Sequence, residues 1–75
     1  MADKLPVLKA REIMRVLFSL GFEHKRQSGS HIFFQHQDGR TTTIPIHGGK
    51  DISGNLLRKI LNDTGISSED FTEYL

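Results

Sequence analysis

The dipeptide Asp38-Gly39 separates two runs of residues that favour extended structure. The run before it is Ser30 to Gln37, "SHIFFQHQ", and the run after it is Arg40 to Ile46, "RTTTIPI", which is rich in β-branched residues. Asp-Gly between such runs is a strong signal for a two-residue hairpin turn. The sequence therefore predicts that the two runs pair as antiparallel strands, in a register where the numbers of opposite residues sum to about 77.

A third extended run precedes this hairpin. It covers Phe22 to Gln27 and is short and polar, and Ser28-Gly29 is the expected turn between it and the next strand. Connections this short cannot cross over the sheet, so the three strands are expected to form an antiparallel meander. Pro45 has no N–H to donate, which predicts a bulge, a strand end or an edge that faces solvent at that position.

Two stretches that flank the strands have the spacing of amphipathic helices. The first runs from Lys9 to Leu20, and Gly21 follows as the helix-ending residue. The second is expected to begin after Ser53 as its N-cap, with Asp51 as the competing cap, and to continue to about Asp63. Their predicted core residues are Ile13, Val16, Leu17 and Leu20 in the first helix and Leu56, Leu57, Ile60 and Leu61 in the second.

The end of the chain predicts one more short helical element. Gly65 stops the second helix, and Ser67 or Ser68 can cap a last turn that carries Phe71, Tyr74 and Leu75. The order of elements is then α-β-β-β-α with an added C-terminal turn. We expect an α+β fold in which two helices cover one face of a three-stranded antiparallel sheet. A chain of 75 residues is expected to form a single domain over residues 1–75.

The composition excludes several classes of protein. The sequence has no cysteine, so neither disulfides nor a thiolate zinc site can stabilise it. No run approaches the roughly 18 apolar residues that a membrane helix needs. The N-terminal "MADKLPVLKA" lacks the hydrophobic core of a signal peptide. These features predict a cytoplasmic protein that does not associate with membranes.

The net charge of +1 conceals an uneven distribution along the chain. Residues 1–50 contain eight Lys and Arg against four Asp and Glu, together with all four histidines. Residues 51–75 contain two basic residues against five acidic ones. A basic first part favours a polyanionic ligand, and ordinary solvated surface charge is the alternative.

Several short motifs follow one another in "GFEHKRQSGSHIFFQHQDGRTTTIPIHGGKDISGNLLRKILNDTGIS". They are the Gly-Phe after the first helix, Gly-Ser-His, Asp-Gly-Arg, Ile-Pro-x-His, Lys-Asp-Ile and "LLRKILNDTGI". In their order and spacing they resemble the HicA toxin family, also called the YcfA-like family, over about Leu8 to Phe71. The resemblance implies a fold like a double-stranded-RNA-binding domain (dsRBD-like). It also implies a messenger-RNA-cleaving toxin of a type II toxin–antitoxin system.

The same resemblance implies a partner and a catalytic residue. In the family a cognate antitoxin, HicB, masks the active face, so we expect a monomeric free toxin that forms a hetero-oligomer with its antitoxin. The histidine of Gly-Ser-His is the catalytic residue of the family, and here it is His31. Many members have a second histidine directly after it, where this chain has Ile32.

Two histidines stand at the same end of the predicted hairpin. RNA carries its own nucleophile, the 2′-OH, so its cleavage needs a base, an acid and positive charge near the phosphate. An imidazole can serve as acid or base near neutral pH. In the predicted register His31 lies opposite Ile46 and His47 opposite Ser30, and strand parity is expected to place both imidazoles on one face. We predict that His31 is catalytic; for His47, catalysis and capping of the loop that follows it both stay open.

Further residues near the hairpin suit RNA binding. Gly29 leaves room for a close approach of RNA to the backbone, and Ser30 can orient a phosphate or hold the turn. If Ile32 and Phe34 face the helices, Phe33 is an exposed ring on the histidine face, where a base can stack or an antitoxin can bind. The predicted phosphate-binding residues, each of which is alternatively a plain surface charge, are Lys25, Arg26, Arg40 and Lys50.

The two remaining histidines give no separate site. His36 lies next to the predicted turn and is expected to be solvated, and His24 is on the polar first strand. No two histidines have a spacing that justifies a metal site, so we predict neither a metal nor another cofactor.

Three functions are compatible with these observations. The first is a metal-independent endoribonuclease that cleaves mRNA as a toxin, with His31 as general base or acid. The second is a non-catalytic RNA-binding module of the same fold. The third is a small interaction domain whose basic face docks on an acidic protein. Imidazoles favour the first, because binding alone needs only Lys and Arg, and a failure to bind RNA at low salt would favour the third.

Overall fold

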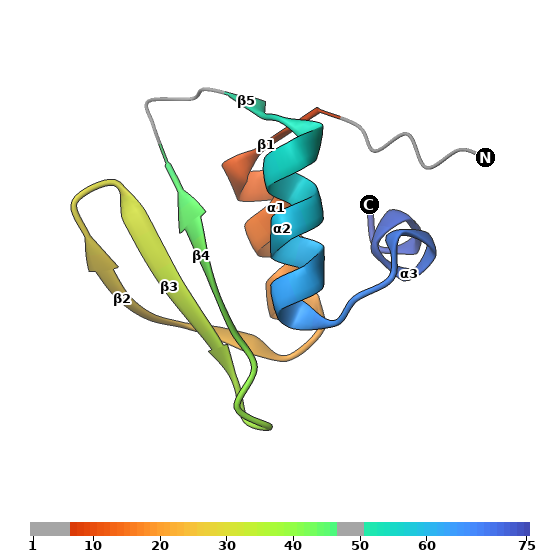
Figure 1. The fold of residues 1–75 in the computed structure, drawn as a ribbon. Helices are drawn as coiled ribbons and strands as arrows, with labels where there is room; N and C mark the ends of the chain where they lie inside the picture. Colours follow the sequence, from red (N-terminus) through yellow and green to blue (C-terminus); the bar gives the residue numbers. More distant parts are fainter. Residues whose placement is uncertain (1–6, 47–50) are drawn as a thin grey trace.

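The computed structural model describes residues 7–46 and 51–75 of the chain. Figure 1 shows two helices on one face of a three-stranded antiparallel sheet, with a short third helix beside them. The predicted α+β arrangement is therefore confirmed. The elements in chain order are β1 (Leu8–Lys9), α1 (Ala10–Ser19), β2 (Phe22–Ser28), β3 (His31–His36), β4 (Thr41–Pro45), β5 (Asp51–Ile52), α2 (Gly54–Thr64) and α3 (Ser68–Glu73).

The helix boundaries follow the capping residues that the sequence contains. In α2 the Ser53 Oγ accepts a hydrogen bond from the Leu56 N–H at 3.3 Å, which makes Ser53 the N-cap rather than Asp51. Gly65 ends this helix in the left-handed conformation, with φ +71°. In α3 the Ser67 Oγ accepts from the Asp70 N–H at 3.0 Å. Short-range signals are sufficient for these boundaries.

A small two-stranded sheet was not expected from the sequence. β1 and β5 pair antiparallel, with Leu8 opposite Ile52 and Lys9 opposite Asp51. Leu8 and Ile52 are buried, and the Lys9 Nζ lies 2.7 Å from Asp51 Oδ1. A strand of two residues has no periodicity that a sequence pattern can reveal.

The hairpin between β3 and β4 differs from the predicted one. The His36 N–H donates to the Arg40 carbonyl, and the Gly39 N–H donates to the His36 carbonyl, both at 2.9 Å. The loop therefore has three residues, with Gly39 at φ +101° as its last residue. Asp-Gly occurs in this loop type as well as in two-residue turns. The predicted two-residue turn is wrong, and the register shifts by one residue, so that His31 lies opposite Pro45 instead of Ile46.

The other strand connection also shifts by one residue. Ser28 lies directly opposite His31, so the turn consists of Gly29 and Ser30 rather than Ser28 and Gly29. Gly29 has φ +60° at the first of these two positions, a conformation that L side chains disfavour. A tight turn of this kind commonly has glycine at its first central position.

A β-bulge interrupts the pairing of β2 with β3. His24 lies opposite Phe34 and Arg26 lies opposite Phe33, which leaves Lys25 as the extra residue on β2. Side chains of a strand alternate between the two faces of the sheet, and an extra residue reverses this alternation beyond the bulge. The bulge thus decides which basic side chain of β2 lies beside Phe33.

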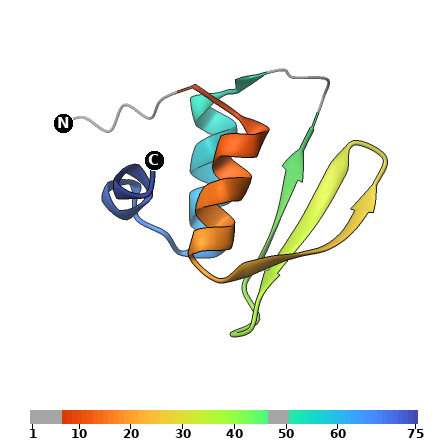
Figure 2. The ribbon, with the colours of Figure 1, turned by 180° about the vertical axis from the view of Figure 1, so that it is seen from behind.

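The core lies between the sheet and the two helices. Ile32, Phe34 and Ile44 point from the sheet toward the helices and are buried, and Phe71 of α3 is fully buried as well. Seen from behind in Figure 2, α1 lies in front of α2, and the turn between β2 and β3 extends away from both helices. In the described residues no helix is long and apolar enough to cross a membrane.

Candidate active site

The face of the three-stranded sheet that points away from the helices is here called the outer face. Because Ile32 and Phe34 are buried on the inner side, the alternate residues of β3 lie on the outer face. Residues directly opposite one another share a face, so the pairing extends this assignment to both neighbouring strands. The outer face consists of Glu23, Arg26 and Ser28 on β2, His31, Phe33 and Gln35 on β3, and Thr41, Thr43 and Pro45 on β4.

His31 is the first residue of β3 and lies exposed at one end of the outer face. Its neighbours across the sheet are Ser28 and Pro45. The backbone around it is held in place, because the Ser30 carbonyl accepts a hydrogen bond from the Ile46 N–H at 2.6 Å. The Gln27 side chain donates to the Gly29 carbonyl at 3.0 Å. A histidine on such a fixed strand end is accessible to a large substrate and is held in one backbone conformation.

Gly29 and Ser30 act first on the conformation of this turn. A Cβ added at Gly29 would meet no atom within 4 Å, so the glycine is required by its positive φ and not by crowding within the protein. The Ser30 carbonyl links the turn to Ile46, the residue that follows β4. Contacts of either residue with RNA stay a prediction.

Phe33 is on the outer face together with His31, as predicted from strand alternation. It is partly buried, and the Arg26 guanidinium carbon lies 4.8 Å from the centroid of its ring. Lys25, the bulge residue, contacts the exposed Glu23 instead, with the ammonium nitrogen 3.0 Å from the carboxylate. Lys25, Gln35 and His36 are among the residues that line a shallow, open depression at the other end of the strand pair.

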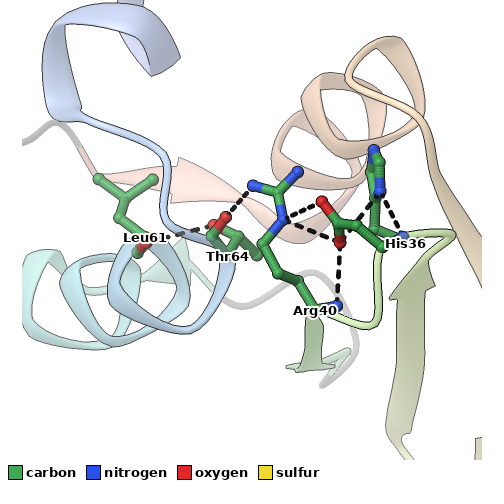
Figure 3. Close-up of polar contacts among 5 residues, drawn as sticks. His36, Arg40, Leu61 and Thr64 are labelled. Carbon is green, nitrogen blue, oxygen red and sulfur yellow. Dashed lines mark hydrogen bonds and ion pairs between the residues drawn. The ribbon is translucent and has the colours of Figure 1, made fainter.

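Arg40 holds the β3–β4 hairpin against the end of α2 (Figure 3). Its Nε donates to Asp38 Oδ2 at 2.9 Å, its Nη1 donates to the Thr64 carbonyl, and its guanidinium lies 5.2 Å from the Phe22 ring centroid. Hydrogen bonds from Arg40 hold the pKa of the Asp38 carboxyl below its ordinary value. These contacts occupy the guanidinium at the end of β3 opposite to His31, where it is too far from that histidine to bind the same phosphate.

His36 is also part of this junction, and the expectation that it is solvated is wrong. Its side chain is 23% exposed. Its ring packs edge-on against Phe22, with the centroids 5.0 Å apart, and its Nδ1 accepts from the Asp38 N–H at 3.1 Å. A Cβ on Gly21, whose φ is +96°, would approach His36 Nε2 to 3.0 Å, so this glycine lets the imidazole pack closely.

Two predicted site residues, His47 and Lys50, lie outside the described residues. The expectation that His31 and His47 share a face was not consistent with the register from which it was drawn. That register placed His47 opposite Ser30, the neighbour of His31, and neighbouring residues point to opposite faces. The role of His47 stays a prediction.

A metal centre is not formed by the described part of the chain. Among residues 7–46 and 51–75, no group of three or more His, Asp and Glu side chains lies close enough together to hold a metal ion. His24 is exposed on β2, and its ring contacts Phe34 edge-on with the centroids 5.9 Å apart. Because His24 lies opposite Phe34, it is on the inner side of the sheet and is separate from His31, which is on the outer face.

A comparison with known protein families gives a match over most of the chain. The model of the family described as the HicA toxin of bacterial toxin-antitoxin systems matches residues 10–66, which include α1, the whole three-stranded sheet and α2. The chain belongs to the HicA toxin family. A search of curated proteins finds no match. Membership of the HicA family makes the chain a toxin-type component of a toxin–antitoxin system and implies an antitoxin partner.

Proposed function

We propose that this HicA-family protein is an endoribonuclease that cleaves mRNA without a metal ion, with His31 as its catalytic base. The observation that carries the proposal is the position of His31, exposed at the end of β3 on the outer face beside a backbone-fixed turn. An imidazole is the side chain best suited to move a proton near neutral pH. The match to the HicA toxin family supports an activity that harms the cell.

The proposed reaction uses the RNA's own 2′-OH as nucleophile. His31 removes the proton from this hydroxyl as O2′ forms a bond to the adjacent phosphorus. The bond between phosphorus and O5′ breaks, and O5′ accepts a proton, for which His47 is the proposed donor. The products are a 2′,3′-cyclic phosphate on the upstream fragment and a 5′-hydroxyl on the downstream fragment. Basic side chains near the phosphate, of which Arg26 and Lys50 are the proposed ones, stabilise its charge in the transition state.

We expect cleavage by the purified protein to persist in an excess of a chelator of divalent ions. The nucleophile is the 2′-OH and the base is an imidazole, so no metal-bound water is required. The assay is the rate of cleavage of a labelled RNA with and without chelator, with a metal-dependent ribonuclease in the same buffer to show that chelation is complete. Loss of cleavage that a divalent ion restores would contradict the proposal.

The antitoxin is proposed to inhibit by covering the outer face around His31. Of the outer-face residues, Arg26 and Glu23 are charged, and Arg26 lies nearer to His31 along the strands. An acidic and apolar partner surface would therefore be attracted to this end of the face and exclude RNA from it. In the complex, His31 is expected to react more slowly with a histidine-modifying reagent than in the free toxin. His24, exposed on β2 and separate from the outer face, is the internal control. Unchanged reactivity of His31 would show that inhibition acts elsewhere.

A further inference from the structure

The pair formed by Arg26 and Phe33 is the most pronounced feature of the outer face after His31. The guanidinium carbon lies 4.8 Å from the ring centroid, within the range of a cation–π contact. Arg26 is exposed, and Phe33 is partly covered. In the part of the chain that the structure describes, Arg26 has no carboxylate within ion-pair distance. Its guanidinium thus lies over the ring, and no carboxylate of the described residues forms an ion pair with it.

The bulge on β2 creates this pair. Without it, the residue after His24 would lie opposite Phe33, and that residue is Lys25. The extra residue moves Arg26 into that place and leaves Lys25 to contact Glu23. A lysine ammonium has no planar surface, whereas a guanidinium can lie on a ring and present its other side to a third flat group. The backbone irregularity therefore selects the side chain that is suited to stacking.

The pair also lies at a suitable distance from the proposed base. Phe33 and His31 are two residues apart on one face of β3, which places them about 7 Å from each other along the strand. One nucleotide can bridge a span of this size. A nucleobase stacked at Arg26 would bring the phosphate of its own nucleotide, or of the adjacent nucleotide, close to His31. Thr43, exposed on β4 opposite Phe33, adds a hydroxyl at the edge of the same position.

We propose that Arg26 and Phe33 together form a stacking platform for one unpaired nucleobase next to the cleaved phosphate, and that the substrate class is therefore single-stranded RNA. This inference rests on the proposed ribonuclease function. Bases in a duplex are stacked on each other and cannot reach a protein ring, whereas unpaired bases stack on aromatic rings and on guanidinium planes. Attack by the 2′-OH also needs O2′, phosphorus and O5′ in line, which an unpaired nucleotide can adopt and A-form stacking prevents.

The test measures binding separately from cleavage. His31→Ala protein is titrated with a single-stranded RNA dodecamer that does not self-pair, and with the same RNA annealed to its complement. Arg26→Lys keeps the charge and removes the plane, and Phe33→Leu keeps apolar bulk and removes the ring. Each is expected to weaken binding of the single strand by about 5- to 100-fold. The double variant is expected to lose little more affinity for the single strand than either single variant, because the two side chains form one platform.

Matched controls and a base-specific readout complete the experiment. Arg15→Lys and Phe18→Leu make the same chemical changes on α1, where both residues are exposed, and are expected to leave binding unchanged. One nucleobase is then removed from the dodecamer, at the position that occupies the platform. This is expected to abolish the difference in RNA affinity between the His31→Ala protein and the same protein with Arg26→Lys.

The outcomes separate this inference from the proposed function. Equal affinity for duplex and single strand, or no effect of Arg26→Lys and Phe33→Leu on RNA binding, would overturn the platform even if the protein cleaves RNA. Variants that bind RNA normally but lose affinity for the antitoxin would assign the pair to the partner interface and also overturn it. Platform-dependent binding with no cleavage by the protein that retains His31 would support the platform and refute the proposed ribonuclease.

Discussion

Replacement of His31 by alanine is expected to lower the rate of RNA cleavage by about 10²- to 10⁴-fold, the usual contribution of a general base or acid. The change removes an exposed side chain and leaves the turn at Gly29 and Ser30 intact, so the fold is expected to persist. Single-turnover cleavage rates of the two proteins measure the effect. Thermal unfolding followed by circular dichroism checks that the variant is folded. Growth inhibition on expression is expected to disappear in parallel.

His24→Ala is the matched control for this change. His24 is also an exposed histidine on the same sheet, but its ring contacts Phe34 and it is not among the outer-face residues. Its removal is expected to leave the cleavage rate unchanged. A folded His31→Ala protein that cleaves RNA at the parent rate would refute the assignment of His31.

Phe34→Ala is expected to remove a large part of the protein's free energy of unfolding. The ring is 0% exposed at the centre of the sheet and contacts Phe18 edge-on with the centroids 5.4 Å apart. Truncation of a buried Phe costs about 3–5 kcal/mol. A chain of 75 residues at about 0.05–0.15 kcal/mol per residue has only about 4–11 kcal/mol of stability. Urea denaturation of the parent and the variant measures the difference in the free energy of unfolding.

Phe18→Ala provides the comparison for Phe34. Phe18 is the same residue type in contact with the same ring, but it is 53% exposed. Its truncation is expected to lower the free energy of unfolding by clearly less, about 1 kcal/mol or below. Equal losses for the two variants would contradict the description of Phe34 as the centre of the core.

Periodicity was sufficient to predict the layers of the fold. The apolar stripe of each helix and the alternation in β3 both arise from burial on one face. The alternation predicted that Ile32 and Phe34 share one face and Phe33 lies on the other, and the structure places Ile32 and Phe34 inside. The capping role of Ser53 could also be predicted, because its side chain accepts a hydrogen bond from a backbone N–H only three residues away.

The register of the strands and the bulge on β2 could not be predicted from periodicity. Asp38-Gly39 fits both a two- and a three-residue loop, so the dipeptide alone does not determine the loop length. The hydrogen bond from Arg40 in this hairpin to the Thr64 carbonyl joins residues that are distant in the sequence and could not be predicted from it. The bulge at Lys25 has no pattern of its own on a strand whose residues are nearly all polar. The contact of Arg26 with Phe33 follows from that bulge, so it also required the structure.

The most direct test of the central claim is the chemistry of the RNA ends that the purified protein leaves. An RNA oligonucleotide is cut briefly and the fragments are weighed by mass spectrometry, beside a copy that has a single 2′-deoxy nucleotide at the cleavage position. With His31 as the base acting on the 2′-OH, the upstream fragment carries a 2′,3′-cyclic phosphate, the downstream fragment carries a 5′-hydroxyl, and the deoxy copy stays intact. A 3′-hydroxyl with a 5′-phosphate, or cleavage of the deoxy copy at the same bond, would contradict the proposed mechanism.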